Sequence, residues 1–345
     1  MRLAVAVFLA LTACSKGTRL ESLPSDTELT LRFGWEPGMR AVHTYTIDKH
    51  RDTPSGVDPV VRVSVRDEII VEEHPEGLAI RKTRGEVIEG SSEGGGSRPS
   101  GFPSREEVLG MLASVPVTRV TTTDGHLVRA EGFEELTAMV EELFGELMRD
   151  LEQEVGPGTE PLRGFLDQVL ARFTPETLAA REQAAHDAMF GEMNGRTVVP
   201  GEAHTWTSTQ QLDLGTPVRF QAEFTERVRG PVLCAPDHSV ARCVEIERSM
   251  VPEPESHGSA VSEALQPLLH GLPLPEEMGL KPSIDSYTMR QTVVRIVEVE
   301  TLRPWSARRE MTQSFRMAFP ALQTSHDQSS TDITEETWVW EGGPR

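Results

Sequence analysis

The chain contains three cysteines, whose thiols are the side chains best suited to covalent or metal chemistry. Cys14 follows an apolar run near the start, whereas Cys234 and Cys243 lie close together in the second half. With His238 between them, these two thiols have the residue types of a zinc site, which would need a fourth ligand and reduced sulfur. In an oxidising compartment the same pair predicts a disulfide that closes a short loop. The compartment in which the protein folds therefore decides between the two.

The first residues are typical of an export signal. Arg2 supplies a positive charge, and residues 3–11 form an apolar run too short to cross a bilayer, which takes about 20 residues. The run ends in Leu11-Thr12-Ala13-Cys14, which resembles the lipobox of bacterial lipoproteins at every position. The resemblance implies cleavage before Cys14, a thioether-linked diacylglycerol on its sulfur and a further acyl chain, such as palmitate, on the new amine. An ordinary secretory signal is the alternative.

These features predict a signal peptide at 1–13 and a tether at 14–26 that joins a membrane anchor to a folded domain at 27–345. Two or three acyl chains suffice for stable anchoring. Ser15 follows the cysteine, where Asp resembles an inner-membrane retention signal, so we expect the outer membrane, on its periplasmic or surface face. Export also favours the Cys234–Cys243 disulfide, worth about 2–3 kcal/mol, over the zinc alternative.

The sequence contains none of the common catalytic motifs, such as G-x-S-x-G, H-E-x-x-H, a Walker loop or a Rossmann glycine set. Glu182 and His186 are four residues apart on a predicted helix and could begin a metal site, but no third ligand is evident. The five tryptophans favour sheet packing over a sugar-binding platform. We therefore expect no enzymatic activity, no cofactor and no metal.

The charge balance also limits the partners. The chain has 54 acidic and 34 basic residues, a net charge of −20, which repels nucleic acid phosphates. The expected partners are the membrane, through the lipid, and an apolar ligand or an envelope protein.

Strand patterns occupy residues 27–130 and 203–341. The clearest shows apolar residues at alternate positions with mostly polar neighbours, which predicts a strand with one buried face: Val61, Val63, Val65, Ile69 and Val71. Similar Pro-Gly turns, Pro37-Gly38 and Pro200-Gly201, each precede a strand that carries an aromatic residue. This repetition suggests a duplicated half-sheet.

Helical periodicity occupies residues 133–190 and predicts about three helices. Thr174 followed by Pro175 predicts the start of the third helix, which would end near Phe190. Each helix has one apolar stripe, which we interpret as a face packed on the sheet or around a ligand. The stripe residues of the first two helices are the candidate apolar face: Leu136, Val140, Leu143, Phe144, Leu147, Phe165, Leu166 and Val169. Strands, then helices, then strands predict the α+β class in one domain.

Several longer segments accompany the lipobox, including TTDGHLVRAEGFEEL, FTPETLAAREQAAHDAMFGEM and VVPGEAHTWT. With the Pro-Gly turns they resemble an uncharacterised family of bacterial envelope lipoproteins with the architecture of the LolA and LppX carriers. The resemblance implies a strongly curved antiparallel sheet, a half-barrel, whose concave apolar face is filled by the helices. It implies no established activity and no binding residue, and it suggests an apolar ligand only in general terms.

Three interpretations of function remain open on the sequence. The first is a lipid-anchored, non-enzymatic envelope lipoprotein that binds an apolar ligand or a partner protein. The second is a structural or assembly lipoprotein with a filled core and no ligand. The third is a hydrolase whose site has no recognisable motif. An open apolar cavity between sheet and helices would favour the first.

Overall fold

A computed structural model describes residues 23, 27–53, 56–92, 110–111, 114–155, 163, 167, 170–213, 217–238, 240–254, 256–262, 283–319 and 324–341. The predicted signal peptide, Cys14 and most of the tether lie outside these residues.

The elements follow the predicted order of strands, helices and strands, so the α+β class is confirmed. They are β1 (Leu29–Thr30), β2 (Arg40–Thr53), β3 (Gly56–His74), β4 (Gly77–Lys82), β5 (Glu86–Ser92), β6 (Val117–Thr121), β7 (Leu127–Glu131), α2 (Phe133–Val155), η1 (Ala171–Phe173), α4 (Pro175–His186), η2 (Asp187–Gly191), β8 (Thr197–Val198), β9 (Ala203–Asp213), β10 (Pro217–Leu233), β11 (Ala241–Pro252), β12 (Ser283–Glu298), β13 (Pro304–Phe319) and β14 (Thr324–Trp340). A further short helix covers 256–262.

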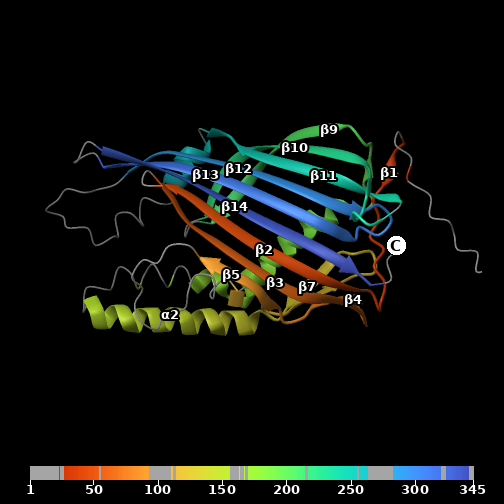
Figure 1. The fold of residues 1–345 in the computed structure, drawn as a ribbon, viewed down its shortest axis with the longest axis horizontal. Coiled ribbons are helices and arrows are strands. Elements are labelled where there is room, and N and C mark those ends of the chain that lie inside the picture. Colours follow the sequence, from red (N-terminus) through yellow and green to blue (C-terminus); the bar gives the residue numbers. More distant parts are fainter. Residues whose placement is uncertain are drawn as a thin grey trace, which may run out of the picture.

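One antiparallel sheet of 12 strands dominates the molecule (Figure 1). Its order is β7-β6-β4-β3-β2-β14-β13-β12-β11-β10-β9, and β5 adds to the first half of β3. The edge strands β7 and β9 do not pair with each other, so the sheet is open. It is not strongly curled, so the half-barrel curvature implied by the family resemblance is not seen.

The two faces of the sheet differ as the alternation on β3 predicts. Val61, Val63 and Val65 are each at most 2% exposed, whereas Arg62 and Arg66 on the opposite face are exposed. We call the face that carries these valines the inner face. The main core lies at one end of it, where four tryptophans and the loops of both half-sheets meet; its aromatic members include Phe33, Trp35, Phe190, Trp305, Trp338 and Trp340.

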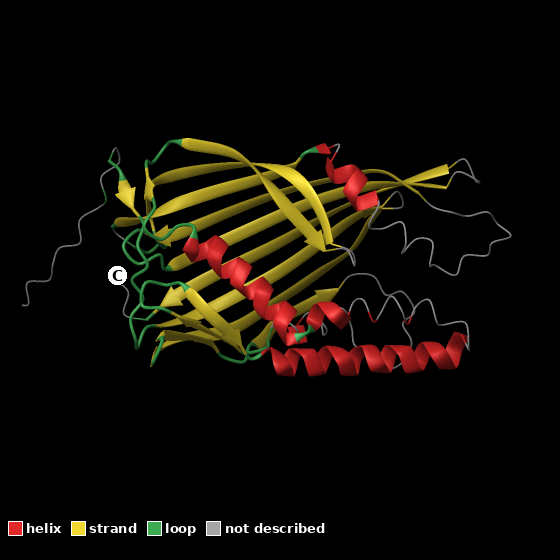
Figure 2. Ribbon diagram, turned by 180° about the vertical axis from the view of Figure 1, so that it is seen from behind, coloured by secondary structure: helices red, strands yellow, loops and turns green. Residues whose placement is uncertain are grey.

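α4 and η2 lie over the inner face, as Figure 2 shows. The start of α4 agrees with its prediction: the Thr174 side chain accepts a hydrogen bond from the Thr177 backbone N–H at 3.3 Å, and Pro175 opens the helix. η2 continues it to Gly191, close to the expected end. Among the described residues, no helix is long and apolar enough to cross a bilayer.

The position of α2 differs from the prediction. α4 packs on β7, but α2 packs mainly on α4 and η1 and projects along the lower edge of the molecule (Figure 2). A helical stripe needs an apolar partner, but that partner can be another helix as well as a sheet. The prediction that the whole helical block packs on the sheet is therefore wrong for α2.

The two Pro-Gly turns have the same geometry. Gly38 and Gly201 have φ values of 91° and 94°, a region that favours glycine. Each donates its backbone N–H, at 2.8 Å, to a carbonyl on the second strand after the turn: Gly38 to Val71 on β3, and Gly201 to Val228 on β10. β1 and β8, which precede the two turns, pair with each other. The two half-sheets therefore begin in equivalent ways.

Candidate functional site

A hollow of about 410 Å³ lies between the inner face of the sheet and η2. Its walls are mostly apolar, and the largest side chains on the sheet side are Trp206, Phe220, Phe224, Met250, Met289 and Met311. Ala188, Glu192 and Met193 close it from η2 and the turn that follows. The volume is within the range of about 300–1,000 Å³ typical of small-molecule sites.

Strand alternation brings these side chains to one face. On β12, every second residue from Met289 to Arg295 points into the hollow, because side chains of one parity share a face. The register places Trp206 opposite Phe224, and Phe224 opposite Met250, on three successive strands. The rings of Trp206 and Phe224 stack with centroids 5.3 Å apart. The result is a continuous apolar surface across the C-terminal half-sheet.

A buried charge cluster borders this surface. The side chain of Glu226 is 1% exposed and pairs with Arg196 at 2.5 Å and with Arg248 at 2.8 Å. Arg248 also pairs with Glu192 at 2.7 Å, and its guanidinium lies 5.4 Å from the centroid of the Trp206 ring. Burial lowers the pKa of Arg248, but its hydrogen bonds to both glutamates outweigh burial and raise the pKa overall. Arg248 is thus held charged between Glu226 and Glu192.

Arg295 lies in the same wall without a carboxylate partner. One of its terminal nitrogens donates to the backbone carbonyl of Ala188 at 3.2 Å. Its Nε is buried and has no hydrogen-bond partner. Burial and the nearby Arg248 both lower the pKa of Arg295.

A second polar cluster occupies the centre of the inner face. The His43 ring lies between Asp67, at 3.0 Å from Nδ1, and Glu336, at 3.2 Å from Nε2. Lys82 lies 3.5 Å from the other Asp67 oxygen, and Trp338 stacks on the His43 ring with centroids 4.9 Å apart. Burial lowers the pKa of His43, but the two carboxylates outweigh it and raise the pKa above 6.5.

A histidine between two carboxylates is also found in general-base catalysis. However, His43 is only 7% exposed, and it lines neither the hollow under η2 nor the one at the β10–β11 end of the sheet. Among the described residues, the ring faces Asp67, Glu336 and Trp338. The cluster therefore orders the middle of the sheet.

The second hollow, of about 1,090 Å³, lies at the end of the sheet that carries the β10–β11 turn. Its walls include Trp305, Trp338 and the apolar side chains of Leu233 and Val339, which are 42% and 66% exposed. It is larger than the hollow under η2. The chain from the predicted tether arrives beside it, where the Leu23 N–H donates to the Ala241 carbonyl at 3.0 Å.

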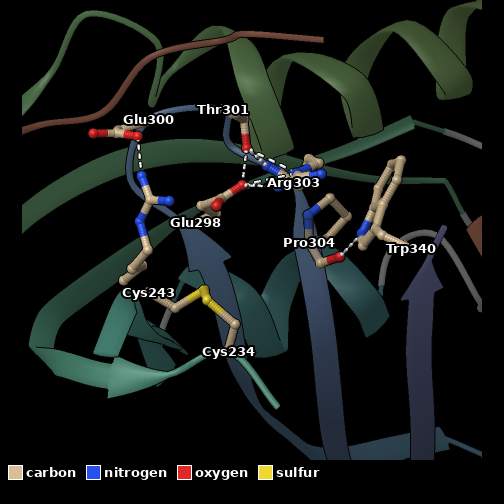
Figure 3. Close-up of a disulfide and its surroundings, with 9 residues drawn as sticks. Cys234, Cys243, Glu298, Glu300, Thr301, Arg303, Pro304 and Trp340 are labelled. Carbon is tan, nitrogen blue, oxygen red and sulfur yellow. Dashed lines mark hydrogen bonds and ion pairs between the residues drawn. A yellow bond between two sulfur atoms is a disulfide. The ribbon is translucent and has the colours of Figure 1, made fainter. Parts of the chain in front are cut away.

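The predicted Cys234–Cys243 disulfide is present and closes the β10–β11 turn (Figure 3). His238, the third residue of the zinc alternative, packs edge-on against Trp305 with ring centroids 4.6 Å apart. His186 of the other suggested metal pair donates its Nε2–H to the Gly125 carbonyl oxygen at 2.8 Å, and Glu182 pairs with Arg119. Within the described part of the chain, no group of three His, Cys, Asp or Glu is placed to hold a metal.

Of the helical candidates for the apolar face, the four whose side chains are described line neither hollow. Val140 is 2% exposed, but Leu136, Leu143 and Phe144 are only half-buried. The side chain of Leu147, together with Phe165, Leu166 and Val169, lies outside the described residues.

The residues that do line the hollow under η2 were not predicted from the sequence. They lie mainly on β9–β13 and the segment after α4. One signal was available in the sequence from Met289 to Arg295. There the charged Arg295 occupies the same alternate positions as Met289 and Val293, so it is placed on the apolar face of the strand.

Comparison of the chain with protein-family models and with curated protein sequences found no match. The fold and site define only a class: an α+β protein with an open antiparallel sheet and an apolar hollow beneath a mid-chain helix. Function must therefore be argued from the geometry of the hollow.

Proposed function

We propose that this protein is a lipid-anchored, non-enzymatic envelope lipoprotein that binds an apolar ligand in the hollow under η2. The observation that carries the proposal is the wall of methionine and aromatic side chains facing about 410 Å³ of space. A filled core would leave no such space, because protein interiors pack to nearly crystalline density. Hence we favour ligand binding over a purely structural role.

The composition of the wall suits a flexible apolar ligand. Met250, Met289 and Met311 line the sheet side, and Met193 lies opposite. Methionine is unbranched and polarisable, so it adapts to ligands of varied shape. This arrangement is similar in principle to the carriers named by the family resemblance, and it needs only a covered sheet face, not a strongly curved one.

The anchor is a second part of the proposal. Leu23 is nine residues beyond Cys14, so the chain between them can span at most about 30 Å. A lipid on Cys14 would therefore hold the disulfide end of the sheet near the membrane, with the outer membrane as the expected location. The Cys14→Ser variant should lose labelling by a palmitate analogue. Unchanged labelling, or fractionation with inner-membrane markers, would contradict this part.

Ligand binding is tested by filling the hollow. Ser208 lines it from β9, whereas its neighbour Thr207 is exposed on the outer face of the same strand. In a full-length chain carrying Cys14→Ser, the fluorescent apolar probe N-phenyl-1-naphthylamine should bind the parent and the Thr207→Trp control. Ser208→Trp should weaken binding more than tenfold. Equal binding by both tryptophan variants would reject the hollow as the site, and no binding by the parent would favour the structural alternative.

A further inference from the structure

Arg295 is the one charged side chain of the hollow wall whose charge is not matched by a neighbour. Among the described residues, no carboxylate oxygen lies within 4.0 Å of its guanidinium. Within the described part of the chain, its one hydrogen bond runs from a terminal nitrogen to the Ala188 carbonyl, and its buried Nε donates to nothing. Arg295 is half-buried with a buried Nε, and a cation removed from water without a partner is costly.

The neighbouring carboxylates are already engaged. Glu226 binds Arg196 and Arg248, and Glu192 binds Arg248. The wall therefore has three guanidinium groups and two carboxylates, which leaves one positive charge.

The nearest further carboxylate is also occupied. Glu336 lies across the sheet from Arg295 and accepts from His43. Each of these three carboxylates thus has a cationic or imidazole partner other than Arg295. The missing partner must therefore come from outside the described residues.

The apolar surface begins at this cation. Along β12, Val293, Gln291 and Met289 follow Arg295 on the same face, so the run is apolar except for one uncharged amide. At about 3.3 Å per residue, the stretch from Arg295 to Met289 covers roughly 20 Å, comparable with a long acyl chain. One half-buried cation at the end of a long, mostly apolar wall matches a molecule with one anionic head and one apolar tail.

We propose that the hollow binds an acyl chain with an anionic head, and that the Arg295 guanidinium binds the carboxylate or phosphate of that head. Guanidinium groups bind both anions through paired hydrogen bonds, so Nε and the second terminal nitrogen are the free donors. A neutral ligand would leave the cation buried and unpaired. The inference rests on the proposed function and names its ligand class.

The test compares ligands that share one apolar tail but differ in their head groups. A full-length chain carrying Cys14→Ser is loaded with the fluorescent fatty acid cis-parinaric acid, which is then displaced by oleate, oleoyl lysophosphatidate or oleyl alcohol. The parent should bind at least one of the two anionic ligands about tenfold or more tighter than the alcohol. The preferred anion identifies a fatty acid or a phospholipid as the source of the head.

Arg295→Met should remove this preference while leaving oleyl alcohol binding within about twofold of the parent. Arg295→Lys should retain part of it, because the charge remains without the paired geometry. The control is Arg290→Met, which changes an exposed arginine on the outer face of the same strand. It should bind all three ligands like the parent.

Equal affinity of the parent for the alcohol and both anions would overturn the inference but leave apolar ligand binding intact. An unchanged anion preference in Arg295→Met would do the same. Failure of the parent to bind the alcohol or either anion would instead reject the proposed function itself.

Discussion

Glu226 offers the sharpest test of how the hollow wall is held together. Its carboxylate is almost fully buried on β10 and joins Arg196 and Arg248, which come from different parts of the chain. Glu226→Gln keeps the shape of the side chain but removes the charge. Both arginines then lose their shared partner in a site that water reaches poorly.

The loss of unfolding free energy in Glu226→Gln can be bounded from the exposed fractions of the two arginines. Removing one member of a buried ion pair typically costs about 3–5 kcal/mol. Arg196 is 33% exposed and Arg248 is 18% exposed and retains Glu192, so both keep some compensation. We therefore expect the lower limit, about 3 kcal/mol. With a urea m value of about 3 kcal/mol/M, the unfolding midpoint should fall by about 1 M.

The assay is equilibrium urea unfolding of the full-length Cys14→Ser chain, followed by tryptophan fluorescence. The control is Glu247→Gln on the outer face, whose partner Arg229 is 51% exposed, and it should cost less than about 1 kcal/mol. Glu226→Leu combined with Arg248→Met should cost less than Glu226→Gln, since it removes the unmatched charge of Arg248. A loss below about 1 kcal/mol in Glu226→Gln would refute this account of the wall.

Three further predictions concern stability. Because the pKa of His43 is raised, its stabilising contribution is complete below about pH 6.5 and is lost as the pH rises through the folded-state pKa. The difference in unfolding free energy between the parent and His43→Gln should therefore shrink from about pH 5.5 to pH 8. A difference that stays constant with pH would contradict this. Replacing Cys234 and Cys243 together by Ala should cost about 3 kcal/mol in urea unfolding, and a reducing agent should bring the parent to the same midpoint. Val140→Asp should lower the thermal midpoint well beyond Phe144→Asp, because Val140 is 2% exposed and Phe144 is only half-buried; equal effects would reject the observed packing of α2.

The sequence was sufficient to predict those features of the fold that a local pattern of residues determines. The β3 alternation predicted its buried face, Thr174 and Pro175 marked the start of α4, and the even cysteine pair predicted the disulfide. Each of these signals depends on residues that are near one another in the chain. The order of strands and helices followed for the same reason.

The site could not be predicted in this way. A charged residue in a strand is ordinarily assigned to the solvent face, yet Glu226 and Arg295 belong to the inner face, where partners from distant strands or a cavity accommodate them. The α2 stripe was recognisable, but periodicity does not say whether the partner is a sheet or a helix. Buried polar groups and the choice of packing partner are decided by tertiary structure.

The centre of the sheet has a consequence for how the molecule forms. β2, one of the first strands, pairs along its length with β14, the last, so that Ala41 lies opposite Trp340. Until β14 is available, two half-sheets each present an unpaired edge at what becomes the middle of the structure, and such edges are prone to pair with other chains. Contacts this distant in sequence also slow folding. Loss of β14 would therefore open the sheet at its centre rather than shorten it at an edge, and an unfinished chain would need protection from its neighbours until the last strand arrives.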